Sequence, residues 1–194
     1  MVKFLVWLKH HLGFLWALIE KLNSLLFHIL WSKKLKNSSF AHKIDDVEFR
    51  VLNKKDDIKL LVSFFTKQPE SAFKFFNPHG FDEKSLIKKQ NDPAFLMIGC
   101  FKNKTLAGYC FLRFFFNKQA FRGKIVSPEF QGQGLAKLMG LVTTQICHDM
   151  GFRLFATISK KNVKSMASSK AVNEVRVIKE LADDYIYVEY LLKK

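Results

Sequence analysis

Cysteine is scarce in this chain of 194 residues, and the few cysteines are not paired. Cys100, Cys110 and Cys147 each lie alone in an apolar segment with strand-like or helical character. The sequence contains no CxxC pair and no His-rich metal-ligand spacing. We therefore expect reduced core cysteines, no disulfide framework and no metal site.

Acidic residues are also few: 17 Asp and Glu stand against 32 Lys and Arg, which gives a formal net charge of +15. Such a charge attracts anions, including CoA phosphates, sugar nucleotides, nucleic acid and an anionic membrane surface. Nucleic acid ranks below the others because no basic helix or RNA-binding motif is present. A lysine-rich surface that serves only solubility is the alternative.

Residues 1–31 lack the long apolar run of a membrane span. Their longest such run, Phe14–Ile19, has six residues, far short of the ~20 that cross a bilayer. A secretory signal is not expected either, since Phe4–Leu8 is too short for its apolar region and no small-residue cleavage site follows.

What this segment does have is an apolar pattern at helical spacing, with the basic stretch 33–36 after it. We predict an amphipathic helix, with Gly13 as a kink, that lies in the interface of an anionic membrane and keeps a cytoplasmic protein at its inner face. The alternative is packing of this face on the rest of the chain or on a second copy, as in a homodimer. The apolar face comprises Phe4, Trp7, Leu8, Leu12, Leu15, Leu18, Ile19, Leu22, Leu25, Leu26, Ile29 and Leu30, and the polar face Lys9, His10, Glu20, Lys21, Asn23, Ser24 and His28.

The rest of the chain reads as one domain, since 48% of the residues are hydrophobic and 25% charged. Lys36–Ser39 has linker character, which predicts a helical extension over 1–38 and a domain over 39–194. Patterning predicts strands at 47–52, 95–101, 106–116, up to 126, 154–158, 175–181 and 185–191, and helices at 56–67, 82–89, 135–150 and 163–172.

The most informative stretch is the junction between the strand that ends at Val126 and the helix that begins at Leu135. Gly132 and Gly134 punctuate the loop between them and permit turns that a β-carbon would forbid. A strand–loop–helix junction of this kind directs backbone N–H groups into one concave space at a helix N-terminus, where the helix dipole favours an anion.

Within this loop, Gln131-x-x-Gly134-x-Ala136 resembles the Arg/Gln-x-x-Gly-x-Gly/Ala signature of the GNAT family of N-acetyltransferases. The order of the predicted elements over about 45–192 is also similar to that family. The resemblance implies an α/β fold with a mixed, mostly antiparallel sheet of about six or seven strands flanked by helices. It also implies acetyl-CoA as acyl donor, with its pantetheine arm between two splayed strands. The donor-binding residues expected from it are Ile125, Val126, Gln131, Gly132, Gln133, Gly134, Leu135, Ala136 and Asn162.

The chain departs from the family at two catalytic positions. Many members carry a Tyr seven residues after the Asn, as the acid that protonates the CoA thiolate, whereas Ser169 stands here. The strand before the loop often offers a carboxylate base, but this one offers Arg122, Gly123 and Lys124. We take Ser169 as the candidate acid, acting through water.

The segment Phe75–Phe81 supplies a second candidate, His79, because histidine exchanges protons near neutral pH. Phe-Phe-x-Pro-His resembles a segment of acetyltransferase-like proteins from bacterial surface-polysaccharide clusters, which act on amino sugars. This resemblance implies that the aromatic rings stack a sugar or base and that His79 accepts the amine proton. The alternative is a structural loop in which His79 bonds a backbone carbonyl.

The leading hypothesis is thus an acetyl-CoA-dependent N-acetyltransferase that acts on the primary amine of an amino sugar or sugar nucleotide in surface-glycan synthesis. One alternative is a catalytically impaired CoA-binding or interaction protein of the same fold. Another is an acetyltransferase that acts on a protein or on aminoacyl-tRNA.

Overall fold

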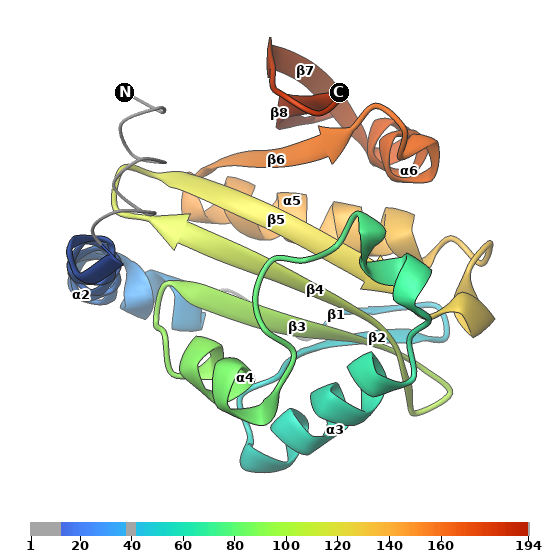
Figure 1. Ribbon diagram of the computed structural model, residues 1–194, viewed down its shortest axis with the longest axis horizontal. Coiled ribbons are helices and arrows are strands. Elements are labelled where there is room, and N and C mark those ends of the chain that lie inside the picture. The colour runs from blue at the N-terminus through green and yellow to red at the C-terminus, as the bar shows by residue number, and fades with distance from the viewer. Residues whose placement is uncertain (1–12, 38–41, 194) are drawn as a thin grey trace.

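The computed structural model describes residues 13–37 and 42–193, which form a mixed sheet with helices on both faces (Figure 1). Its eight described strands follow the order β1-β2-β3-β4-β5-β6-β8-β7, and only the β5–β6 pair is parallel. The strands are β1 (His42–Ile44), β2 (Val47–Val51), β3 (Phe95–Lys102), β4 (Thr105–Phe115), β5 (Gln119–Val126), β6 (Arg153–Ser159), β7 (Asn173–Glu180) and β8 (Tyr185–Leu192).

The predicted fold class is confirmed, with one strand more than expected. The additional strand is β1, which has three residues and is therefore too short to show a period of two in the sequence. Two predicted hairpins are present. Asn103 and Lys104 form the turn between β3 and β4, and Asp183 and Asp184 form the turn between β7 and β8. All four have positive φ, as tight turns between antiparallel strands require.

The helices match the predicted ones to within one or two residues, apart from the first. They are α2 (Gly13–Asn37), α3 (Lys55–Thr66), α4 (Glu83–Gln90), α5 (Leu135–Met150) and α6 (Val163–Val172), with short 3-10 turns η1 (Glu70–Lys74) and η2 (Pro128–Phe130). Figure 1 shows α3 and α4 in front of the sheet and α5 behind it.

Two apolar clusters hold these layers together, one on each face of the sheet. Residues of α3, α4 and η1 pack on one face, with Tyr109 and Phe111 of β4. Residues of α2 and α5 pack on the other, with Cys110 and Leu112 of β4. Because alternate side chains of β4 enter opposite clusters, this strand is apolar almost throughout.

β5 and β6 part from each other, as the expected pantetheine site requires. They pair at only three positions, from Gln119 with Arg153 to Phe121 with Phe155. Beyond Phe121, β5 stays on β4 as far as Val126, while β6 follows β8 as far as Ser159. The two central strands therefore diverge toward the start of α5 (Figure 1).

Helix α2 is attached to the domain through one stripe. Phe27 is fully buried, stacks on Phe114 at 5.0 Å between ring centroids and meets the edge of Phe152 at 6.0 Å. Asn23 donates through Nδ2 to the Phe114 carbonyl at 3.0 Å and accepts from the Phe116 amide at 3.1 Å. The helix is described through Asn37 and so continues into the segment predicted as a linker.

The side of this helix predicted to be polar is the side that packs on the domain, and the side predicted to be apolar faces solvent. Glu20, Asn23 and Ser24, which were predicted on the polar face, point toward the domain, where they bond Arg113, the end of β4 and Asp92. The apolar residues pointing to solvent are Phe14, Leu18, Ile19, Leu22, Leu25, Ile29 and Leu30, each at least 43% exposed. Hydrogen bonds decide which side of α2 packs on the domain, because the end of β4 has backbone groups that need partners and Asn23 supplies them.

Replacing Phe27 with Ala is expected to reduce the free energy of unfolding by about 3–5 kcal/mol, the usual cost of truncating a buried Phe. The matched control is Leu22→Ala on the exposed side of the same helix, expected to change it by less than about 0.5 kcal/mol. Urea unfolding measures both. Equal, small losses would show that α2 contributes little to the stability of the domain.

Candidate active site

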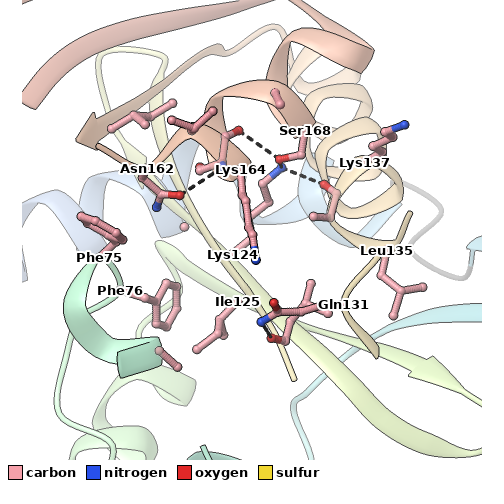
Figure 2. A pocket seen from close by; sticks show the side chains of 18 of the residues that line it. Phe75, Phe76, Lys124, Ile125, Gln131, Leu135, Lys137, Asn162, Lys164 and Ser168 are labelled. Atoms are coloured by element: carbon pink, nitrogen blue, oxygen red, sulfur yellow. Dashed lines mark hydrogen bonds between the residues drawn. The ribbon is translucent and has the colours of Figure 1, made fainter. Parts of the chain in front are cut away.

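A pocket occupies the opening between β5 and β6. Its walls come from η1, β5, the loop and first turn of α5, β6, α6 and Tyr190 of β8. Figure 2 shows Phe75 and Phe76 across the pocket from Gln131 and Leu135. The volume is about 1270 Å³, more than the ~300–1,000 Å³ of a pocket for one small ligand. Two substrates can therefore meet in it.

The loop before α5 forms a cradle of free amides at one end of the pocket. Gly132 and Gly134 have φ of 82° and 79°, and a β-carbon on either would meet no atom within 4 Å. In the described part of the chain, no hydrogen bond engages the amides of Gly132, Gly134, Leu135 or Ala136. These donors at a helix N-terminus fit an anion such as a diphosphate.

Of the nine residues predicted to bind the donor, eight line this pocket: Ile125, Val126, Gln131, Gly132, Gly134, Leu135, Ala136 and Asn162. Gln133 does not, because its side chain turns outward to accept from Lys102 at 2.9 Å and to donate to the Glu129 carbonyl at 3.3 Å.

Backbone alternation along β5 determines which of its amides face the opening. The Ser127 amide, just after β5, donates to the Ala107 carbonyl of β4 at 2.9 Å. From there back to Gln119, β5 pairs with β4 without a register shift. Because hydrogen-bonded and outward residues alternate in an antiparallel pair, the Ile125 amide faces β4. Those of Val126 and Lys124 face the opening.

Asn162 begins α6 and contributes to the opposite wall. Its Oδ1 accepts from the Ser165 amide at 3.1 Å, which caps the helix. This bond fixes the side chain at the pocket and leaves its amide Nδ2 as a donor (Figure 2).

Comparison with known proteins identifies the family. The model of the acetyltransferase (GNAT) family matches residues 61–168, more than half of the chain. The chain belongs to the GNAT family. It is thus an acetyltransferase by family, and the predicted enzyme class is confirmed.

Solved GNAT structures share its fold at low sequence identity. The GNAT domain of S. lividans PAT is 15% identical, with a TM-score of 0.63 over 75% of this chain and 90% of that one. Spermidine N-acetyltransferase from Vibrio cholerae, in complex with CoA and spermine, is 17% identical, with a TM-score of 0.59 over 77% and 96%. Mycobacterium smegmatis RimJ, in complex with CoA-disulfide, is 13% identical, with a TM-score of 0.62 over 75% and 81%. No curated protein matches the chain significantly.

The two predicted catalytic residues of this GNAT protein do not line the pocket and do not meet. The ring of the first, His79, makes two hydrogen bonds. Nδ1 lies 2.9 Å from the Gly80 carbonyl oxygen, and Nε2 lies 3.1 Å from the Tyr109 hydroxyl. Since a carbonyl only accepts, Nδ1 carries the proton, and the neutral ring accepts from Tyr109. Burial, with Lys89 nearby, lowers the pKa of His79. This is the arrangement of the alternative that the sequence left open, a structural loop.

Ser169 is fully buried behind the pocket wall. Its hydroxyl lies 3.3 Å from that of Tyr190, and its neighbour Ser168 takes the place at the wall. Arg113 of β4 also lies outside the pocket lining and pairs with Glu20 of α2 at 2.8 Å.

Two cations of β5, Arg122 and Lys124, line the pocket but were not predicted as site residues. In the sequence they stood only where the family often has a carboxylate. The available signal was their spacing of two residues in an otherwise apolar strand, which places both on one face. No residue lining the pocket is acidic among those the structure describes, and those residues include no group of three or more potential metal ligands.

Replacing Gly134 with Trp is expected to abolish CoA binding in calorimetry, because the side chain would project into the cradle. Gly151→Trp is the matched control. Gly151 ends the same helix with φ of 73°, has no atom near its β-carbon position and lies outside the pocket. Both variants should lose about 1–2 kcal/mol of stability from left-handed backbone strain. Equal CoA affinity in the two variants would contradict the assignment of the cradle.

Proposed function

We propose that the protein transfers the acetyl group of acetyl-CoA to the primary amine of an amino sugar that carries a diphosphate, as a sugar nucleotide or lipid-linked precursor of a surface glycan. One observation carries the proposal: a pocket with an amide cradle for a diphosphate is open to a second substrate and is lined by cations without an acid.

In this proposal the cradle at Gly132–Ala136 holds the diphosphate of acetyl-CoA, and Gln131 and Lys137 lie beside it. The pantetheine arm follows β5 into the opening. There it bonds the amides that β6 leaves free, as an added strand would, and accepts from Nδ2 of Asn162. The thioester carbonyl accepts from the Lys124 amide, which polarises it. Ile125 contributes its side chain to the wall rather than its amide.

The acceptor enters from the side of η1. Phe76 is buried and Phe75 is 36% exposed at the pocket, so both rings offer faces for a sugar ring. Since no acid lines the described pocket, the amine enters neutral and passes its proton to water after attack. Positioning of the two substrates then supplies most of the rate enhancement.

Charge separates an amino-sugar diphosphate from a polyamine. Five cations and no carboxylates line the described pocket: Arg122, Lys124, Lys137, Lys161 and Lys164. A polyamine is positively charged along its length and would be repelled by this lining. We therefore propose a different acceptor from that of spermidine N-acetyltransferase, although the two proteins share a fold. A protein or aminoacyl-tRNA acceptor, and a catalytically impaired CoA-binding protein, are the alternatives that the assay below distinguishes.

We expect thiol release from acetyl-CoA in the presence of nucleoside-diphosphate amino sugars, and at least tenfold lower kcat/KM with spermidine or a peptide amine. The free amino sugar without its diphosphate is the matched control and should lose affinity. CoA binding without turnover on any amine would indicate the impaired protein. No CoA binding at sub-millimolar concentration would contradict the donor site itself.

We also propose that α2 attaches the enzyme to an anionic membrane. Phe14, Leu18, Leu22, Leu25 and Ile29 form one exposed apolar stripe along it, with spacings of three and four residues. Exposed Lys33 and Lys34 follow near its end, and the chain carries a net charge of +15. An apolar face with flanking cations is typical of interfacial helices. No helix of the described chain is long and apolar enough to span a bilayer.

The double variant Leu22→Glu, Ile29→Glu is expected to stop co-flotation with vesicles that contain anionic lipid, with acetyl transfer unchanged. Val177→Glu with Ile178→Glu is the matched control, since both side chains are exposed on β7, away from α2. Point variants are preferred to a deletion of α2, because the deletion would remove Phe27 and expose the apolar surface that it covers. Unchanged flotation, or a loss of dimer mass instead, would overturn membrane attachment.

A further inference from the structure

Two cations sit side by side in the pocket wall without a carboxylate to balance them. Arg122 and Lys124 form no ion pair within residues 13–37 and 42–193. Arg122 is 6% exposed, and its Nη2 is buried without a hydrogen bond among the described residues. Buried unpaired charge is unfavourable, so such a pair indicates a site where negative charge arrives or develops.

Arg122 is held in place by several contacts, so it supplies a fixed positive charge and not a proton. Its Nη1 donates to the Gly140 carbonyl at 2.9 Å and to the hydroxyls of Thr143 and Thr144 at 3.0 and 3.1 Å. Its guanidinium lies 3.8 Å from the centroid of the Tyr190 ring. A guanidinium stays protonated in proteins, so it cannot exchange a proton here.

Lys124 is placed differently, with one N–H left for the pocket. Its Nζ donates to the Ala136 carbonyl at 2.7 Å and to the Ser168 hydroxyl at 3.0 Å (Figure 2). An ammonium has three N–H donors, and no third acceptor is present in the described protein. Lys124 thus bridges the first turn of α5 and the wall of α6 at the point where β5 leaves β6.

In the donor placement proposed above, the thioester of acetyl-CoA lies beside Lys124. From the cradle, the pantetheine arm follows β5 from Val126 toward Phe121, where the strands close. Val126 and Arg122 are about 13 Å apart at ~3.3 Å per residue. The thioester therefore lies between these two, beside Lys124. The Ser168 hydroxyl, bonded to Lys124, belongs to the same turn of α6 as Ser169, the position of the family's tyrosine.

We propose that Lys124 donates a proton to the CoA thiolate as the acetyl group leaves, in place of the tyrosine that this chain lacks. The role rests on the acetyl transfer proposed above. The amine nitrogen bonds to the carbonyl carbon, the carbon–sulfur bond breaks with its electron pair on sulfur, and one Nζ proton moves to sulfur. Lys124 becomes neutral and regains a proton from water, while the amide nitrogen of the product loses its extra proton to water.

The surroundings of Lys124 suit this transfer. Burial, followed by the charge of Arg122, lowers its pKa from 10.5 to about 7, below the ~8.5 of a free thiol. Proton transfer to sulfur is therefore downhill. The titratable and charged groups around it are Arg122 on β5, Cys110 on β4, Lys137 on α5, Lys164 on α6 and Tyr190 on β8. Burial raises the pKa of the Cys110 thiol, which stays protonated.

The decisive variant is Lys124→Met, which keeps the length of the side chain and removes the proton. We expect kcat to fall ~10²–10⁴-fold, the usual contribution of a general acid, with CoA affinity in calorimetry within about threefold of wild type. In wild type, kcat should fall as pH rises through about 7, because the donor must be protonated. This alkaline fall should be absent from Lys124→Met.

Two further variants separate proton donation from charge. Lys124→Arg keeps the charge but releases no proton near neutral pH, so it should be as slow as Lys124→Met. Lys137→Met removes an exposed pocket cation, and should weaken CoA binding while the pH dependence of kcat persists. Full turnover in Lys124→Arg, or a loss confined to CoA affinity in Lys124→Met, would overturn the proposal.

A readout without turnover locates the donor at this lysine. Reductive methylation at pH 7 with formaldehyde and cyanoborohydride, followed by mass spectrometry, should modify Lys124, because a neutral amine is the reactive form. Saturating CoA should protect it. Modification that CoA leaves unchanged, in a protein that calorimetry shows to bind CoA, would place Lys124 away from the thiol and contradict the role.

Discussion

The parting of β5 from β6 is the constraint on which the site depends. A sheet interior normally pairs every amide, and unpaired buried amides are costly. Here the chain keeps β5 on β4 and β6 on β8 after only three shared positions, so the facing amides of Lys124 and Val126 have no strand partner. A ligand that supplies carbonyls along its length satisfies them, which is why an extended pantetheine arm suits this opening better than a compact molecule.

Helix α2 packs on the domain with one side and leaves an apolar stripe on the other side for the membrane attachment proposed above. α2 is fastened by Phe27 and by the bonds of Asn23 to the end of β4, the strand next to β5. On the other side of the helix, Phe14, Leu18, Leu22, Leu25 and Ile29 face solvent as a stripe. Attachment through one stripe thus fixes the orientation of the other, and a membrane that binds it would hold the pocket in one orientation toward the lipid.

The sequence predicted the fold well, and eight of the nine expected donor-binding residues line one pocket, because the signals for both are local. The helix over 135–150, the glycines of the cradle and the two hairpin turns depend on spacing and backbone freedom within a few residues. The side on which α2 packs and the placement of His79 depend on contacts that are distant in the sequence. Asn23 and His79 are positioned by partners 91 and 30 residues away in the chain, and no period of three or four residues contains that information. The burial of Ser169 was likewise not predictable, because it depends on how α6 is rotated about its axis, which places Ser168 and not Ser169 at the pocket.

An ammonium in place of a phenol would change how such an enzyme responds to pH. A phenol stays protonated well above neutrality, whereas burial beside Arg122 brings the pKa of Lys124 to about 7. The acceptor amine must be neutral, and a lysine donor must be charged. The two requirements overlap only where the pKa of the amine is near or below that of Lys124. Amines beside electron-withdrawing hydroxyls, as in amino sugars, are less basic than polyamines. The charge of the pocket and the identity of its proton donor therefore favour the same class of acceptor, each through a separate physical effect.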